Sequence, residues 1–416
     1  MKLINTILAS ALMTGASLAS AEVEWVEPRS ADLRAASLET NPRAVPASMH
    51  TESAAINFTW APDESQSLRP SAGEPTPGDG NAAVESRQYW VDVTGRDLAE
   101  GIELPLTAPG AVIRISALDD SAGVRLDSRA LELTLDGRPT SAEMGIAEVR
   151  SGRELRSQGM SVPEDTLAFR LTGRHGGGTL GLKLPGVAGD QAMVVHVYEP
   201  NSDWVARLSA PRHNFLSGQA LNLETELGNA RQNLQADSVQ AILVSPDATQ
   251  TWPISQARGG GLVLNEAPIA TNAEPGQGLY EAHVYLETDF EGLTIRRDLK
   301  LALNIAPALA RLDGQARRVE SRDFGLELGV ESAIGGRFQI NAELMGTNRR
   351  GELESIGFVQ SADVIEAGGG QISLEFDREL MRKSGLSAPF EVHNLQLLDQ
   401  GRMFLLEDRE RALIIR

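Results

Sequence analysis

Few side chains in this sequence are available for nucleophilic or acid–base chemistry, because cysteine is absent and histidine occurs six times in 416 residues. The run HGGG at positions 175–178 is similar to the oxyanion loop of lipases and esterases. That loop assists acyl transfer only beside a serine in a G-x-S-x-G turn, and no serine here has that setting. A flexible hairpin is therefore the favoured interpretation of the run, and we expect no catalytic residue.

Metal binding is the second chemistry that the residue types allow. The acidic loop LDDSAGVRLD offers Asp119, Asp120 and Asp127 as a weak calcium candidate, but it lacks the D-x-D-x-D-G spacing that wraps a chain around a cation. His196 and His283 lie in two different alternating segments, and we expect them in separate modules, too far apart to share one zinc ion. The sequence predicts no cofactor and no metal site beyond the weak calcium candidate.

The elements that must position these residues are β-strands, because the dominant period of the apolar residues is two. Short alternating runs such as LELTLDG, LGLKLPG, MVVHVYEP and QISLEF are separated by Gly, Pro, Asp and Asn, which is typical of antiparallel sheets with one buried face. Helical pattern is confined to the short pieces SGRELRSQG and DRELMRKSG. The sequence therefore predicts an all-β protein.

A repeated phrase indicates three β modules. The segments VVHVYEP, EAHVYLE and FEVHNLQ each place a histidine in a late alternating strand, at separations of 87 and 110 residues. These spacings are close to the length of one immunoglobulin-like unit. We expect three tandem β-sandwich modules, of which the last two are immunoglobulin-like, with boundaries near 199–203 and 305–310.

The segment GLYEAHVYLETDF, residues 278–290, predicts one strand of a hairpin in the second module. Gly278 stands two residues before Tyr280, as in the tyrosine corner of immunoglobulin-like sandwiches. His283 alternates with the apolar residues and should point outward, where it is a possible binding-surface residue. Trp252 follows a polar turn and precedes a proline, so it is a second candidate for such a surface.

The N-terminal residues indicate export. Residues 1–21 combine Lys2, a short apolar run and the small-x-small ending ASA, as in a secretory signal peptide. Without cysteine there is neither a disulfide nor a lipid anchor, and no later segment is long and apolar enough to insert into a membrane. We expect the mature protein in the periplasm or secreted.

The predicted domains follow from these patterns. Residues 22–50, rich in Ala, Ser, Glu and Pro, should form a disordered or loosely ordered arm. An N-terminal β-sandwich domain is expected at 51–200, with a mobile Pro/Gly-rich excursion near 62–86. Immunoglobulin-like domains should then occupy 201–306 and 307–416. Within the first of these three, INFTW at 56–60 has the alternation of a strand that docks onto a neighbouring sheet.

Several phrases occur in the order found in a known family: GMSVPEDTLAFRL, VVHVYEP, GLYEAHVYLETDFEGLTIRRD and SAPFEVHNLQLLDQGRMFLLEDR. They resemble exported Gram-negative bacterial proteins of the domain-of-unknown-function 4785 family, which have C-terminal immunoglobulin-like modules. The resemblance covers roughly residues 100–416. It implies fold and export, and it supplies no substrate or active residues.

The net charge of −19 makes a nucleic acid an improbable partner, because phosphate binding needs clustered Lys and Arg. We therefore expect an exported, non-catalytic binding or interaction protein whose partner is a protein or a cell-envelope or extracellular polysaccharide. One alternative is an accessory or chaperone-like factor for a secreted enzyme, acting by strand addition. The other is a glycoside hydrolase with acids in the first β domain, since paired carboxylates leave no sequence signature. The oligomeric state is open.

Overall fold

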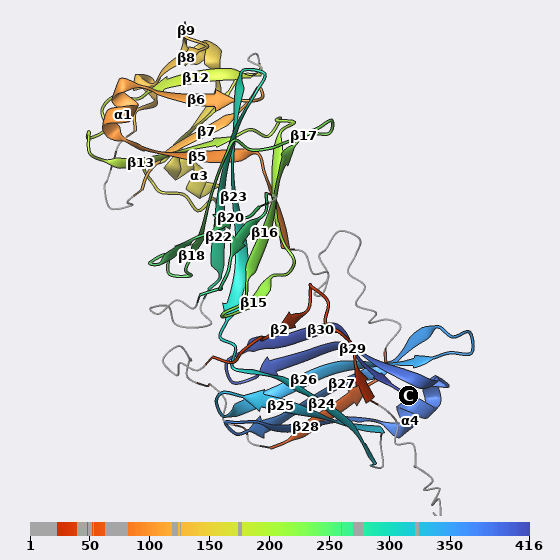
Figure 1. The fold of residues 1–416 in the computed structure, drawn as a ribbon. Helices are drawn as coiled ribbons and strands as arrows, with labels where there is room; N and C mark the ends of the chain where they lie inside the picture. Colours follow the sequence, from red (N-terminus) through yellow and green to blue (C-terminus); the bar gives the residue numbers. More distant parts are fainter. Residues whose placement is uncertain are drawn as a thin grey trace, which may run out of the picture.

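The computed structural model describes residues 23–39, 48, 52, 54–62, 82–118, 124, 126–173, 177–258, 260–268, 278–320 and 324–416. These residues are mostly β and form several sheets, nearly all antiparallel, in three β domains that each enclose an apolar core. Figure 1 shows the first and third domains at opposite ends of the molecule, with the second between them. The predicted β class and multi-domain organisation are confirmed.

The first domain packs two sheets around a core that includes Phe169, Leu180 and Val195. One sheet has the order β10 (Ile146–Ser151), β11 (Leu167–Leu171), β7 (Val112–Ala117), β13 (Ala192–Tyr198) and β5 (Gln88–Thr94). The other has the order β6 (Ile102–Leu106), β12 (Gly178–Lys183), β8 (Glu132–Leu135) and β9 (Arg138–Thr140). Strand β5 is the sheet edge that faces the second domain.

The second domain also has two sheets. One has the order β20 (Ser255–Gln256), β21 (Leu262–Leu264), β16 (Leu221–Gly228), β14 (Val205–Ala210) and β4 (Ala82–Ser86), with β17 (Asn233–Leu234) beside β16. The other has the order β15 (Asn214–Leu216), β23 (Leu293–Ala306), β22 (Tyr280–Phe290), β18 (Ser238–Val244) and β19 (Thr251–Pro253). The long hairpin β22–β23 extends beyond this domain, and β23 packs against β5 and β6 of the first (Figure 1).

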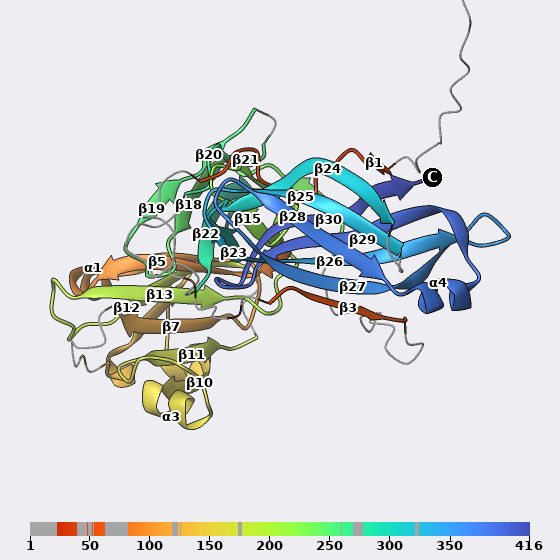
Figure 2. The ribbon, with the colours of Figure 1, turned by 90° about the horizontal axis from the view of Figure 1, so that it is seen from below.

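The third domain holds the widest sheet. Its order is β1 (Val23–Trp25), β30 (Phe404–Ile415), β29 (Ser387–Asp399), β26 (Gly336–Thr347), β27 (Leu353–Ile365) and β3 (Ile56–Trp60), with β2 (Leu33–Arg34) also on β30. A smaller sheet of β24 (Ala310–Glu320), β25 (Phe324–Ser332) and β28 (Gly370–Phe376) covers its inner face. Figure 2 shows β3 running along β27 at the margin of the wide sheet.

The described helices are all short, as the sequence pattern predicts. They are α1 (Gly95–Glu100), η4 (Ser128–Ala130), α2 (Ala142–Gly145), α3 (Gly152–Ser157) and α4 (Arg378–Ser384). Ser151 begins α3 in a capping box with Glu154, and Asp377 begins α4 by accepting from two backbone N–H groups. Capping of this kind lets helices of six or seven residues persist between strands.

The N-terminal arm is more ordered than its composition suggests. Strands β1 and β2 pair with β30, and Leu33 is 2% exposed in the core of the third domain. The predicted disordered arm is therefore corrected for residues 23–39, because an apolar residue every few positions is enough to anchor a strand on an existing sheet. The predicted signal peptide lies outside the described residues.

Two strands of the predicted first domain belong to other sheets. INFTW forms β3 on the third domain's β27, and residues 82–86, expected in a mobile excursion, form β4 on β14 of the second domain. Alternation predicts a strand and its buried face, but it does not specify which of the six sheets supplies the partner. Most of the predicted excursion lies outside the described residues.

Candidate functional site

A buried ion pair joins the first domain to the second. Glu199 follows β13, Arg297 lies in β23, and both side chains are 0% exposed. Arg297 Nη1 donates to Glu199 Oε2 at 2.9 Å. The remaining guanidinium N–H groups donate to the carbonyl oxygens of Trp204 and Arg296 and to hydroxyl oxygens, so all five donors are used.

The first domain satisfies the carboxylate of the pair. Glu199 Oε1 accepts from the backbone N–H groups of Thr107 at 2.5 Å and Ala108 at 3.1 Å, and Oε2 accepts from the Thr107 hydroxyl at 2.8 Å. Ser202 and Thr107 hydroxyls both accept from Arg297 Nη2, at 2.8 and 2.9 Å. Because the Arg297 guanidinium of the second domain donates to Glu199 and Thr107 of the first, the network ties the two domains together.

Beside this network lies the interdomain cleft, a hollow of about 750 Å³ that strands of both domains line. The first domain contributes residues of β5 and β13 and Leu118, which follows β7, and the second contributes residues of β18, β22 and β23. Its lining residues are Trp90, Val91, Asp92, Leu118, Val194, Ser238, Gln240, His283, Tyr285, Leu286, Glu287, Arg296, Asp298 and Lys300. The buried ion pair is one of the contacts that join the two domains beside this cleft.

Trp90 lines the cleft and contacts two ionisable side chains, His196 and Lys300. His196 stacks on the indole with ring centroids 5.0 Å apart, and the Lys300 ammonium lies 5.3 Å from the indole centroid. The Trp90 backbone N–H donates to Asp298 Oδ2 at 2.6 Å. Asp298 thereby caps the free edge of β5 and forms a second tie between the domains.

The cleft shifts the pKa values of three of these groups. Burial raises the pKa of Asp298 to about 7, against the opposing effects of the Trp90 N–H, Arg296 and Arg297. Burial also lowers the pKa of His196 to about 4, helped by Arg114 and Lys300. The pKa of the Tyr285 phenol is raised by burial first and then by the nearby acids Asp298 and Asp92. Perturbed groups gathered in a cleft mark a functional-site candidate.

Three cleft side chains are available to a ligand. Tyr285 is 38% exposed. Asp92 and Lys300 form no ion pair with another described residue, whereas Arg296 is bonded to Glu287 at 2.5 Å. The cleft therefore offers one carboxylate, one ammonium and one phenol that are not already bonded to charged neighbours, and these can donate to and accept from hydroxyl and amide groups.

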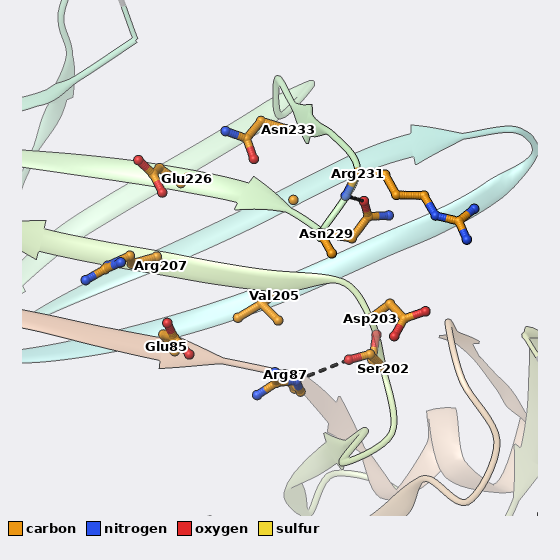
Figure 3. A pocket seen from close by; sticks show the side chains of 12 residues that line it. Glu85, Arg87, Ser202, Asp203, Val205, Arg207, Glu226, Asn229, Arg231 and Asn233 are labelled. Atoms are coloured by element: carbon orange, nitrogen blue, oxygen red, sulfur yellow. Dashed lines mark hydrogen bonds between the residues drawn. The ribbon is translucent and has the colours of Figure 1, made fainter. Parts of the chain in front are cut away.

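A second hollow, of about 670 Å³, lies on the outer face of β4, β14 and β16. Figure 3 shows Arg207 between Glu85 and Glu226, its partners on the two neighbouring strands, and Arg87 bonded to the Ser202 carbonyl at 3.1 Å. Acids and arginines are balanced in this hollow. Alternating charges across adjacent strands are the ordinary composition of a solvated sheet face, so the interdomain cleft is the stronger candidate.

The structure places His283 in the cleft wall. Its side chain is 15% exposed, and Nε2 lies 2.8 Å from Glu281 Oε2 on the same outward face of β22. His196 and His283 lie in different domains; His196 stacks on Trp90, and Lys300, which contacts Trp90 from the second domain, stands opposite His283 in the β22–β23 ladder. Separation along the chain does not predict that Trp90 and Lys300 meet, because β5 and β23 approach across a domain boundary.

The other sequence-predicted residues lie away from the cleft. Trp252, in β19, is half-buried, packs against the second core and has its ring centroid 6.2 Å from that of Tyr280. Gly278 has a left-handed φ of +94°, and Tyr280 after it is 5% exposed. Asp127 caps η4 by accepting from the Arg129 N–H, while Asp119 and Asp120 lie outside the described residues.

Within the part of the chain that the structure describes, no group of three or more His, Asp or Glu side chains could hold a metal ion. None of the described helices is long and apolar enough to cross a membrane. Sequence reasoning missed Trp90, Asp298 and Arg297. The only signal in the sequence was the run RRD within an otherwise alternating strand. Alternation expects an apolar residue at one of the two neighbouring positions 297 and 298, but both carry charged side chains.

Comparison with known proteins places the chain in a family. Its N-terminal domain model, described as the domain of unknown function DUF4785 N-terminal domain, matches residues 47–199, and the corresponding C-terminal domain model matches residues 309–416. This chain belongs to the DUF4785 family. A crystal structure of a DUF4785 family protein from Legionella pneumophila covers 92% of this chain and 98% of its own, with a TM-score of 0.69 and 16% identity.

That likeness shows a shared DUF4785 fold and nothing about ligands. A crystal structure of Salmonella alpha-2-macroglobulin reacted with methylamine covers 80% of this chain and 23% of its own, but its TM-score of 0.20 and 11% identity support no inference. No curated protein matches the sequence. In this DUF4785 protein, Trp90 and Asp92 fall within the matched N-terminal domain, and Tyr285 and Lys300 fall between the two matched ranges.

Proposed function

We propose that this protein is an exported, non-catalytic binding protein whose interdomain cleft binds a cell-envelope or extracellular polysaccharide. The observation that supports this best is the cleft itself: about 750 Å³, lined by two domains, with a partly exposed tyrosine and unpaired charged groups. Inter-domain clefts with a few convergent polar groups are the usual place for a ligand. A polysaccharide suits this lining because its hydroxyl groups can both donate and accept.

The wider proposal follows the sequence and the family. We infer that residues 1–21 are a signal peptide and that the second and third domains are immunoglobulin-like, with Gly278 and Tyr280 forming a tyrosine corner. The left-handed Gly278 and the buried Tyr280 are consistent with such a corner. A row of β domains tied by buried contacts presents clefts and sheet faces to a partner, which suits binding more than chemistry.

Tyr285→Ala should weaken binding of an envelope polysaccharide extract by about tenfold, the loss expected when one aromatic contact is removed. Binding is measured by affinity electrophoresis of the full chain through gels that contain the extract. Tyr198→Ala is the matched control, because Tyr198 is 42% exposed and does not line the cleft. Equal mobility of the two variants would exclude the cleft, and retention by a protein in the extract would assign it to a protein partner.

One observation favours a glycoside hydrolase as the second candidate. Asp298, with a pKa of about 7, and Asp92 line the same cleft from opposite domains. Glycoside hydrolysis uses two carboxyl groups, one of which stays protonated near neutral pH to act as the general acid.

If the binding proposal is correct, the native chain releases no new reducing ends from the extract, and Asp92→Asn alters affinity alone. Release of reducing ends that Asp92→Asn abolishes, with the fold intact by circular dichroism, would instead establish hydrolysis.

The accessory-factor alternative requires an arm that is free to donate a strand to a partner. In the described residues the arm already pairs in cis, because β1 and β2 lie on β30. A partner would have to displace these strands, so this alternative has less support than ligand binding in the cleft.

A further inference from the structure

The outer face of the wide sheet in the third domain carries a transverse row of side chains across five strands. From β3 to β30, the residues opposite one another are Trp60, Phe358, Glu343, His393 and Arg411. The inner-facing neighbours in these strands form the core, so this row points outward. It begins with aromatic rings and ends with charged groups.

A second row runs parallel to the first, two residues further along β3 and β27. It consists of Phe58, Gln360, Asn341, Gln396 and Asp408. Four interstrand steps of about 4.8 Å make each row roughly 19 Å long. Both rows begin with an aromatic residue at the β3 margin and continue with polar side chains toward β30: Glu343, His393 and Arg411 in the first row, and three amides and Asp408 in the second.

The aromatic end is open to solvent. Phe58 is 59% exposed and Trp60 is 48% exposed, and the Trp60 and Phe358 rings lie with centroids 5.9 Å apart and planes 20° apart. Large apolar side chains are rarely left exposed side by side unless they meet a ligand or a partner. Because the two rings are stacked on each other, Phe358 supports Trp60 while Trp60 and Phe58 stay open to solvent.

The middle of the face is held in place by side-chain hydrogen bonds. Gln339 donates to Asn341 at 2.7 Å, Asn341 donates to Gln396 at 3.4 Å, and Asn394 donates to Glu343 at 2.8 Å. The amides therefore stand in fixed orientations with donor and acceptor atoms left over.

At the far end the charges are largely compensated. Arg411 bonds both oxygens of Glu391, and His393 lies 2.8 Å from the same carboxylate. The remaining acids, Glu343 and Asp408, disfavour a polyanion. A partner for this face should therefore be neutral, with flat apolar patches at one end and many hydroxyl or amide groups along its length.

We propose that this face is a second glycan-binding surface, on which a neutral β-linked chain lies across the strands with its sugar rings stacked on Trp60 and Phe58. The apolar ring faces and equatorial polar groups of such a chain complement exposed aromatic rings at one margin followed by amide, carboxylate and other polar side chains. This surface lies in the third domain, apart from the interdomain cleft, and does not depend on binding there. In the chain, β3 comes before the strands of the first domain, so a segment that joins the third domain's sheet from near the N-terminus supplies the stacking residues.

The experiment uses hexamers of β-1,4-linked N-acetylglucosamine and of β-1,4-linked glucose, with the full chain. We expect at least one hexamer to bind, measured by calorimetry and by a change in tryptophan fluorescence, and Trp60→Ala to weaken it by about tenfold. Trp60→Tyr should retain most of the affinity, because a flat ring remains. Met403→Ala is the control, since Met403 is 77% exposed in the same domain and outside both rows.

Two results would overturn the proposal. One is the absence of binding of either hexamer to the native chain, which would favour a protein partner for this face. This result would not bear on the interdomain cleft, which is tested separately with the polysaccharide extract. The other is binding that Tyr285→Ala abolishes and Trp60→Ala leaves unchanged, which would place the hexamer in the cleft. Loss of affinity in Trp60→Ala and Phe58→Ala, with unchanged urea unfolding, establishes the surface.

Discussion

Replacing Arg297 with methionine should lower the free energy of unfolding by about 3–5 kcal/mol. The Glu199 carboxylate would remain 0% exposed without its charged partner, and the Thr107 and Ser202 hydroxyls would each lose a donor. The cost arises from an uncompensated buried charge rather than from the net strength of the ion pair. Loss of the network should also loosen the first domain from the second, and with it the cleft.

Arg296→Met is the control for this substitution. Arg296 is the neighbouring residue, but its bond to Glu287 is partly exposed, with side chains 35% and 46% accessible, so its loss should cost less than about 1 kcal/mol. The measurement is urea unfolding followed by tryptophan fluorescence, because Trp90 and Trp204 lie on either side of the junction. Similar midpoints for the two variants would show that the buried pair does not hold the domains together.

Asp298→Asn should stabilise the protein at pH 8 by roughly 2–4 kcal/mol and have little effect near pH 4, at about 1.4 kcal/mol per pKa unit. Burial raises the pKa of Asp298 from 3.8 to about 7, so the carboxyl is held protonated more tightly in the folded chain than in the unfolded one. Asparagine keeps an oxygen that can accept from the Trp90 N–H.

The direction of the pH effect follows from proton binding. Between pH 3.8 and 7 the folded state binds more protons at Asp298 than the unfolded state does, so its contribution to stability is present at low pH and is lost as the pH rises through this window. His196 acts oppositely, because burial lowers its pKa to about 4 and its contribution is lost as the pH falls below 6.5. Both chains retain His196, so its effect cancels in the difference between them.

The test is urea unfolding of the native chain and the variant at several pH values from 4 to 8. The stability difference should grow steadily in favour of asparagine as the pH rises. A difference that is constant across this range would mean that Asp298 is already ionised at pH 4 in the folded protein. In that case its bond to Trp90, and not its burial, would dominate its ionisation.

Alternation in the sequence predicts which side chains of the candidate sites share a face of a strand, but only the tertiary structure shows what that face contacts. Alternation in GLYEAHVYLETDF correctly places His283 and Tyr285 on the outward face of β22, since a strand has only two faces. It gives no sign that this face lies against β5. INFTW similarly predicts a strand with Phe58 and Trp60 on one side, but only the pairing with β27 aligns them with the amides of the wide sheet.

The sequence by itself determines that this protein is mostly β and multi-domain, because the period-two burial of apolar residues is a local property of each strand. The tertiary structure alone decides that β1 pairs with β30 and β3 with β27. It alone also brings Glu199 to Arg297 and places Asp92 and Asp298 in one cleft. These contacts join residues that are far apart in the chain, and the pattern of a single sequence does not indicate which distant residues lie close together in space. Their energies depend on burial, which a charged residue in an alternating strand acquires only when another domain covers it.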